Sequence, residues 1–249
     1  SFLASTGKNK LKHLLQAANL VLPITSSLQE YLIKRYALNS NKCLVIPNAI
    51  EHSEIQINES RVDAINKQYR LSEVTVLGFV GSIFPYHGVD RLIRGVANMN
   101  YTDVSILIVG DGYLIPALKK LAEELGISER VHFTGSVPKE DIYNYISAMD
   151  ILTLPNTEWY CSPVKLFEYG AFGKTILAVD EAGVSDVMST EEGLLFENND
   201  SAFQDALLRA ITDVDVLKIK AQNFKQKVLK KHTWRANAHK VLQHINSVQ

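Results

Sequence analysis

Residues 162–168 (SPVKLFE) hold the residue types that suit a site for an anion. Serine is a preferred N-cap and proline is preferred at the first helical position, so we predict that a helix begins at Pro163 with Ser162 as its cap. The free N–H groups and the dipole of a helix N-terminus favour phosphate. The pattern therefore predicts a phosphate site at this point in the chain.

Glu168 falls on the apolar side of the same predicted helix, between Val164 and Phe172 at about 100° per residue. A carboxylate on a buried face is costly unless it has a partner. The hydroxyl groups of a ribose or another sugar would supply one. An internal ion pair with an arginine or lysine is the alternative interpretation.

A second candidate is the loop of residues 81–88 (GSIFPYHG), which follows an apolar stretch. Gly81 lets the backbone approach a ligand closely, and His87 can donate a hydrogen bond to a phosphate or sugar oxygen. In the alternative interpretation, His87 only caps or packs the loop.

Two further motifs do not predict a binding site. Residues 110–112 (GDG) lack the third glycine of a dinucleotide fingerprint, which favours a tight turn between strand and helix. Residues 213–215 (DVD) lie between two predicted helices, where we interpret them as a helix stop and cap rather than a metal site. The seven histidines have no spacing typical of metal ligands, so we predict no metal.

The elements that must position these residues alternate in type from residue 74 to residue 196. The strands are mostly continuous apolar stretches, as in sheets buried on both faces, so the pattern predicts an α/β fold with a doubly wound parallel sheet. The predicted strands are Val74–Gly81, Ser105–Gly110, Val131–Thr134, Ile151–Leu154, Thr175–Val179 and Gly193–Phe196. The predicted helices between them are Gly88–Met99, Tyr113–Leu125, Glu140–Met149 and Pro163–Phe172.

The two ends differ from this middle part. After residue 200 we predict only helices, over Phe203–Thr212, Leu217–Lys230 and Trp234–Ile245. Before residue 43 there is an apolar stretch and a helix that ends near Tyr36, and Cys43–Ile46 is predicted as a short strand. Since so few elements do not make a domain, we interpret residues 1–42 as part of a neighbouring unit in a longer protein.

Composition is that of a soluble globular chain, with 46% apolar and 21% charged residues among 249. The two cysteines have no CxxC spacing, which favours a reducing compartment, and no apolar stretch approaches a membrane span. The net charge of −1 is uneven: residues 1–42 carry +5, residues 216–249 carry +8, and the middle carries −14. Basic ends suggest an anionic partner such as lipid or nucleic acid, or simply helix surfaces that differ in charge.

Seven short segments between about residues 43 and 247 match, in order, the motifs of a known protein family. The chain resembles the C-terminal, donor-binding half of a family 4 retaining glycosyltransferase, with the two-lobed, glycogen-synthase-like fold. Trp234 and the helix after it resemble the family's closing helix, which crosses back to the other lobe. The segments are Val45–Ala49, Phe79–Ser82, His87–Ile93, Leu107–Gly112, Val131–Gly135, Ala148–Asp150 and Ser162–Lys174.

The resemblance implies a Rossmann-like domain that binds a nucleotide sugar, UDP- or GDP-linked, as substrate and needs neither cofactor nor metal. Glu168 matches the second glutamate of the family's Glu–seven residues–Glu motif, which holds the donor ribose. Tyr160 stands where the family has the first glutamate, which contacts the transferred sugar. Val137 matches the place where the backbone meets the base. The residues so implied are Glu168 and His87 as catalytic, with Gly81, Ser82, Val137, Tyr160, Ser162, Pro163, Val164 and Lys165 as donor-binding.

The same resemblance implies the organisation of the chain and its setting. Residues 1–42 would be a remnant of the N-terminal lobe, 43–205 the nucleotide-sugar domain, and 206–249 the C-terminal helices. The enzyme would be a cytoplasmic transferase of polysaccharide biosynthesis that acts on a glycan or lipid-linked acceptor. It would make peripheral contact with the inner face of a membrane and would bind no nucleic acid, and the exposed face between the lobes would allow a dimer.

Two alternatives remain open at this point. One is a nucleotide-sugar epimerase of the same architecture. The other is a non-catalytic module that binds a nucleotide or a sugar, because a fold alone does not fix a function.

Overall fold

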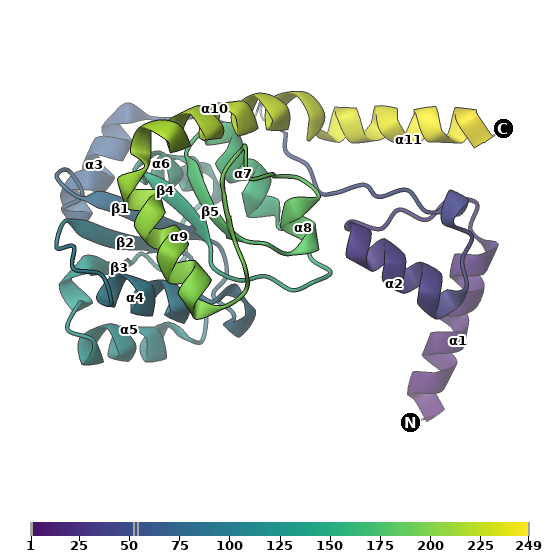
Figure 1. Cartoon of the computed structure of the whole chain (residues 1–249), viewed down its shortest axis with the longest axis horizontal. Helices are drawn as coiled ribbons and strands as arrows, with labels where there is room; N and C mark the ends of the chain where they lie inside the picture. The colour runs from purple at the N-terminus through teal and green to yellow at the C-terminus, as the bar shows by residue number, and fades with distance from the viewer. Residues whose placement is uncertain (1, 52, 54, 249) are drawn as a thin grey trace.

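The computed structural model describes residues 2–51, 53 and 55–248, and its centre is one parallel sheet of six strands (Figure 1). The strand order β3-β2-β1-β4-β5-β6 is that of doubly wound nucleotide-binding folds, so the predicted fold class is confirmed. The strands are β1 (Thr75–Val80), β2 (Val104–Val109), β3 (Val131–Phe133), β4 (Ile151–Leu154), β5 (Thr175–Val179) and β6 (Leu194–Phe196).

The sheet is buried on both faces, which explains why its strands are mostly apolar. On β1, Leu77 and Phe79 belong to one core layer, whereas Val76 and Val80 belong to the other. The first layer also takes side chains from α4 (Val89–Ala97), α5 (Ile115–Glu124) and α9 (Asp200–Thr212). The second takes side chains from α3 (Glu59–Tyr69), α6 (Ile142–Ser147), α7 (Val164–Phe172), α8 (Ala182–Ser185) and α10 (Val214–Lys231).

Glycines bring the loops at the carboxyl edge of the sheet into backbone contact. Gly110, at φ 128°, leaves no room for a side chain, since a Cβ there would lie 2.2 Å from Gly81 O. A Cβ on Gly112 would lie 2.3 Å from Ile83 O, and Gly110 N donates to Gly135 O at 3.0 Å. The GDG motif is thus a tight turn, as predicted, and it packs the loops after β1, β2 and β3 against one another.

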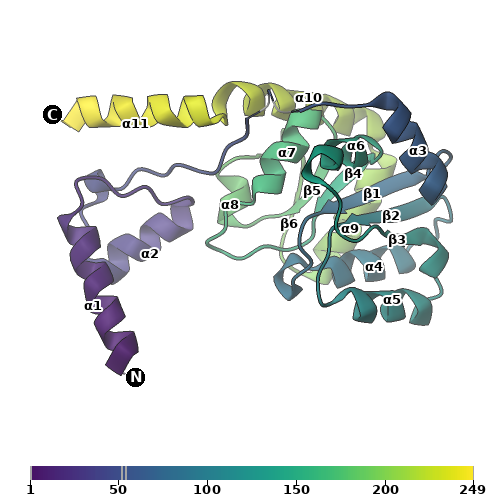
Figure 2. The same ribbon diagram turned by 180° about the vertical axis from the view of Figure 1, so that it is seen from behind.

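Residues 2–50, called the N-terminal segment below, lie to one side of the sheet (Figures 1 and 2). They form α1 (Phe2–Ala17) and α2 (Ser26–Tyr36), joined to the sheet by an extended stretch. The strand predicted at Cys43–Ile46 was wrong: Cys43 makes only an isolated bridge to Val21, and the described part of the segment offers no sheet to extend it.

The last helix ties this segment to the rest of the chain. α11 (Trp234–Val248) extends from the end of α10 over the N-terminal segment (Figure 1). On it, Asn237 Nδ2 donates to Pro47 O at 2.8 Å and Lys240 Nζ donates to Val45 O at 3.0 Å. None of the helices described is both long and apolar enough to span a bilayer.

Candidate functional site

The start of α7 differs from the prediction in one detail. The helix begins at Val164, and its N-cap is Pro163, which gives no side-chain hydrogen bond. Ser162 is buried and does not cap the helix, because its Oγ accepts a hydrogen bond from Asn48 N at 3.0 Å. Asn48 Nδ2 also donates to Ser162 O at 2.6 Å. The prediction that Ser162 is the cap was therefore wrong, and the first turn of α7 is left without a side-chain cap.

Lys165 lies on this first turn and projects beneath the loop after β1. Its Nζ is 3.3 Å from His87 Nε2 and 4.8 Å from the ring centroid of Phe79. A Cβ on Gly81 would lie 3.0 Å from the Cε and Nζ atoms of Lys165, so the glycine leaves the space that the ammonium group fills. Within the described residues, Lys165 forms no ion pair with a carboxylate.

The pKa of Lys165 reflects this environment. Burial lowers the pKa of the ammonium group to about 8, while the charges of Glu168 and Cys161 act in the opposite direction. The group is thus mostly charged at pH 7. A buried cation of this kind is costly without an anion nearby.

His87 sits on the other side of the Lys165 ammonium group. Burial, followed by the nearby charge of Lys165, lowers the pKa of His87 to about 4, so the ring is neutral at pH 7. Its Nδ1 accepts a hydrogen bond from Phe84 N at 3.4 Å, and its ring contacts Phe79 and Tyr86. The histidine therefore packs its loop, as one interpretation held, and it also faces Lys165. Whether it donates to a ligand stays a prediction.

Glu168 lies one turn after Lys165 and is partly buried. Burial raises the pKa of its carboxyl group, whereas Lys165 and Lys139 lower it. The next residue, Tyr169, is fully buried, and its hydroxyl accepts a hydrogen bond from Val80 N at 2.9 Å. Tyr169 thus fixes α7 against the end of β1. Sequence reasoning missed this contact, since a tyrosine in an apolar helix looks like any other core residue.

The remaining predicted residues lie around this cluster. Ser82 is exposed, Val164 is 48% exposed, and Val137 is partly buried against the second core layer. Tyr160 is exposed and packs edge-on against Trp159, with ring centroids 5.4 Å apart. The structure therefore brings together Gly81, His87, Lys165 and, through its charge, Glu168. Their roles toward a ligand stay predictions.

The aspartates at 213 and 215 lie where α9 ends and α10 begins. Asp213 lies at the junction of α9 and α10, where it forms an ion pair with Arg209 at 3.3 Å. In the parts of the chain described, no three His, Cys, Asp or Glu side chains are grouped to hold a metal ion.

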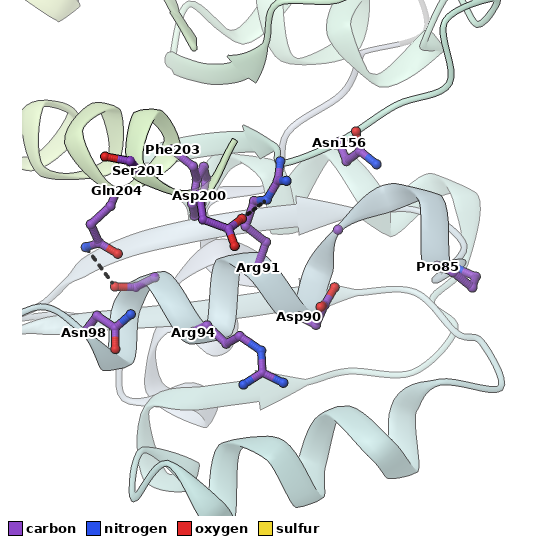
Figure 3. A pocket seen from close by; sticks show the side chains of 12 residues that line it. Pro85, Asp90, Arg91, Arg94, Asn98, Asn156, Asp200, Ser201, Phe203 and Gln204 are labelled. Carbon is purple, nitrogen blue, oxygen red and sulfur yellow. Dashed lines mark hydrogen bonds and ion pairs between the residues drawn. The ribbon is translucent and has the colours of Figure 1, made fainter. Parts of the chain in front are cut away.

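A polar groove of about 610 Å³ lies between α4 and α9 (Figure 3). Arg91 donates to Asp200 Oδ1 at 3.0 Å and to Pro155 O at 3.0 Å, while Gln204 Nε2 donates to Gly95 O at 3.2 Å. These groups hold the helices and the loop after β4 together. The groove contains neither Lys165 nor Glu168, so it is separate from the cluster described above.

Comparison with known proteins finds one matching family. Residues 74–213 match the family model described as "Glycosyl transferases group 1". A D-inositol 3-phosphate glycosyltransferase of Nocardia farcinica is 28% identical over 83% of this chain and 48% of its own length. The gpi3 subunit of the phosphatidylinositol N-acetylglucosaminyltransferase of Schizosaccharomyces pombe is 23% identical over 90% of this chain and 48% of its own length. The chain thus spans about half the length of these curated relatives.

Solved structures show the same fold. Anabaena Alr3699/HepE, determined in complex with UDP and glucose, superposes with a TM-score of 0.84 at 19% identity, over 97% of this chain and 67% of that protein. The lipopolysaccharide glycosyltransferase WaaG superposes with a TM-score of 0.73 at 20% identity, over 88% of this chain and 60% of that protein.

Proposed function

This chain belongs to the group 1 glycosyl transferases, and from that premise we propose that it is the donor-binding half of a retaining glycosyltransferase. The enzyme transfers a sugar from a nucleoside diphosphate sugar to an acceptor. The observation that carries the proposal is the ammonium group of Lys165, which is partly buried beneath Gly81, feels the charge of Glu168 and forms no direct ion pair among the residues described. A diphosphate would supply an anion in direct contact with it.

In this proposal the diphosphate lies between the loop after β1 and the first turn of α7. Cleavage of the bond between sugar and phosphate increases the negative charge on the leaving group. The Lys165 ammonium group and the uncapped N–H groups at the start of α7 would stabilise that charge without having to reorganise. Because Ser82 and His87 carry no positive charge at pH 7, Lys165 takes the main electrostatic role.

The other predicted residues fix the position of the donor. Glu168, held by α7 one turn after Lys165, accepts hydrogen bonds from the ribose hydroxyls. Burial raises the pKa of its carboxyl group, because the carboxylate is partly shielded from water. Hydrogen bonds from a bound ribose would replace the missing water. The backbone near Val137 meets the base. The nucleotide sugar is a substrate here, and we propose no cofactor and no metal.

For the acceptor, the proposal names only a chemical class. We propose a glycan or a lipid-linked sugar, bound by parts of the enzyme beyond this half. The basic ends of the chain, at +5 and +8, would favour an acidic membrane surface. Sedimentation with acidic vesicles tests this point, since an absence of binding contradicts it.

The donor site is tested by calorimetric titration with UDP, GDP, ADP, TDP and NAD. We expect one diphosphate to bind. Lys165→Met should weaken it about 10- to 100-fold, as for the loss of an interaction with a charged group. Glu168→Gln should weaken it less and should reduce the preference for ribose over deoxyribose. Equal binding by all three proteins would contradict the proposed site.

A further inference from the structure

Tyr169 brings a polar group into the core of the sheet region. Its side chain is fully buried, and its hydroxyl accepts a hydrogen bond from Val80 N at 2.9 Å. Burial raises the pKa of this hydroxyl, so it stays protonated. A buried hydroxyl costs free energy that an apolar side chain of the same shape does not, unless it satisfies a group that would lose its partner without it. Its contribution to the fold therefore lies in what it does for Val80 N.

β1 and β4 separate before they reach the carboxyl edge of the sheet. Their ladder ends at the pair of Gly78 and Leu152, while β1 continues to Val80. Gly81 N donates to Val109 O of β2 at 2.8 Å, and because N–H groups alternate in direction along a strand, Val80 N points to the β4 side. The tyrosine hydroxyl takes the place that a carbonyl group of β4 would have if the ladder continued. The gap lies where the strand order reverses, which is where open parallel sheets bind ligands.

Lys165 crosses the carboxyl edge of the sheet at this point. It belongs to α7, whose buried side chains lie in the second core layer, whereas Phe79 lies in the first. The Lys165 ammonium group nevertheless lies 4.8 Å from the ring centroid of Phe79 and 3.3 Å from His87 Nε2. The lysine therefore reaches from one face of the sheet to the other, and it does so past Gly81, whose lack of a side chain leaves the space.

Tyr169 and Lys165 lie on the same side of α7, because they are four residues, or about one turn, apart along the helix. Another side of α7 is closely packed on α10, since a Cβ on Gly170 would lie 2.6 Å from the ring of Phe224. The ammonium group also has little room at Gly81, where an added Cβ would lie 3.0 Å from it. A change in how α7 sits on β1 would therefore be transmitted to the ammonium group.

From these contacts we propose that Tyr169 is a positioning residue for the donor diphosphate. Its hydroxyl bridges the gap between β1 and β4 and fixes α7, so that the ammonium group of Lys165 is held beside Gly81 before any ligand binds. Tyr169 itself touches no ligand, because its side chain is fully buried. A charge that is already in place does not have to reorganise when the diphosphate binds or leaves. The inference rests on the proposed function, which supplies the ligand of Lys165.

Thr153 of β4 offers a matched control. Its side chain is also fully buried, and its Oγ1 donates to Gly78 O of β1 at 2.9 Å. Tyr169→Phe and Thr153→Val each remove one buried hydroxyl that bonds the backbone of β1, and each keeps the shape of its side chain, so we expect both variants to fold. Their urea midpoints should fall by similar amounts. Only Tyr169, however, belongs to the helix that carries Lys165.

The position of Lys165 can be measured without any ligand, because its ammonium group lies next to His87. Burial, followed by the charge of Lys165, lowers the pKa of His87 to about 4, so the ring of the unaltered chain stays mostly neutral from pH 8 to pH 5. NMR of histidine-labelled protein follows this ring over that range, with its signals assigned through His87→Asn. In Tyr169→Phe we expect the ring to protonate within the range, because Lys165 is no longer held beside it. Thr153→Val should titrate like the unaltered chain.

Calorimetry with UDP and GDP measures the consequence for the ligand. We expect Tyr169→Phe to weaken binding of the preferred nucleoside diphosphate about three- to tenfold at pH 7, and Thr153→Val to leave it unchanged. In the unaltered chain the affinity should fall as the pH rises through the Lys165 pKa of about 8. In Tyr169→Phe this fall should move to higher pH, since a less buried ammonium group titrates closer to the ordinary lysine value. The other titratable groups that act on Lys165, Glu168 and Cys161, are retained in both variants.

Tyr169 only packs the core, and the proposal is overturned, if Tyr169→Phe loses stability while the His87 titration and the affinity stay as in the unaltered chain. A changed His87 titration with unchanged nucleotide affinity also overturns the role toward the donor. The same changes in Thr153→Val would mean that any hydroxyl on β1 suffices, which contradicts the proposal as well. If the unaltered chain binds no nucleotide, the proposed donor site fails, and the His87 titration still decides whether Tyr169 positions Lys165.

Discussion

The sheet with its helices and the N-terminal segment are stabilised in different ways. The sheet is covered by two large apolar layers whose side chains are almost all inaccessible to water. Among the side chains described in the N-terminal segment, one small cluster is formed, whose buried members are Tyr36, Leu38 and Cys43. Hydrogen bonds within the segment, such as the one from Gln29 Nε2 to Cys43 O at 2.7 Å, add to this cluster. Further hydrogen bonds come from α11 and run to the loop at Trp159.

This difference bears on where the donor is proposed to bind. Every residue assigned to the diphosphate belongs to the sheet region, either on the loop after β1 or on the chain that enters α7. The two regions meet at Tyr31 of α2 and Trp159 of the loop after β4, whose ring centroids are 5.5 Å apart. We therefore expect donor affinity to depend mainly on the sheet region.

The largest expected effect is the loss of a core side chain from the sheet region. Phe224 on α10 is fully buried and packs against Gly170 of α7. Phe224→Ala should lower the free energy of unfolding by about 3–5 kcal/mol. Urea unfolding measures it, with Tyr36→Ala from the N-terminal segment as the comparison, for which we expect less than half that loss. Equal losses would mean that the two regions unfold as one unit with equally tight cores.

The next effect is the pH dependence of nucleoside diphosphate binding. As the pH rises through the Lys165 pKa of about 8, the ammonium group loses its charge and affinity should fall, by about tenfold between pH 7 and pH 9. His87 stays neutral over this range, because its pKa is about 4. Burial raises the pKa of Glu168 and that of the Cys161 thiol, the other two titratable groups whose charges act on Lys165.

Calorimetry at four pH values checks this expectation, with Lys165→Met as the control. The variant should bind weakly and with little change across the range. A wild-type affinity that stays constant from pH 7 to pH 9 would remove Lys165 from the site and would weaken the assignment of donor binding to the sheet region.

A matched pair of helix caps gives a smaller effect. Thr25 caps α2 by accepting a hydrogen bond from Leu28 N, and Asn199 caps α9 by accepting one from Ala202 N. Replacing either with alanine should cost about 1 kcal/mol. Thr25→Ala should speed hydrogen exchange within α2 alone, whereas Asn199→Ala should lower the melting temperature of the sheet region. If Thr25→Ala lowered the melting temperature of the sheet region as much as Asn199→Ala does, the proposed difference between the two regions would be contradicted.

The smallest effect concerns an ion pair between Arg61 of α3 and Asp141, which directly precedes α6. The Arg61 guanidinium lies 2.6 Å from Asp141 and lowers the pKa of that carboxyl group. Its contribution is therefore present above the ordinary aspartate pKa and is lost as the pH falls through the lowered one. Because the Arg61 side chain is 39% exposed, we expect Asp141→Asn to cost about 1 kcal/mol or less at neutral pH.

In the N-terminal segment, the matching pair of Lys34 and Glu30 is far more exposed, at 79% and 68%. Glu30→Gln should therefore leave the urea midpoint unchanged at any pH from 4 to 7. A pH-dependent loss as large as that of Asp141→Asn would contradict the contrast between the regions.

The same contrast explains which strands and helices could be predicted from the sequence. Apolar continuity predicted all six strands, since the four central strands are almost wholly buried and the edge strands β3 and β6 are partly buried. α3 was missed because Ile65 is its only buried residue, which leaves no apolar periodicity to detect. The strand expected at Cys43 failed because a strand depends on partners that its own residues do not specify.

For the site, the resemblance implied that Gly81, His87, Lys165 and Glu168 would belong together. It did not predict the direct approach of Lys165 to His87, because that depends on the path of a long side chain beneath a glycine. The hydrogen bond from Asn48 N to Ser162 Oγ could not be predicted either. The hydroxyl can cap α7 or accept from a residue 114 positions away, and the sequence does not show which of the two occurs.

The hydrogen bonds of α11 also constrain the order of folding during synthesis. Pro47 O meets its donor on Asn237 only after another 190 residues have been added, and Asn41 O contacts His244 at a separation of 203. Contacts so distant in sequence are slow to close. The N-terminal segment therefore leaves the ribosome before α11 and can complete its packing only when that helix emerges, so a chaperone that binds the segment meanwhile would compete with α11.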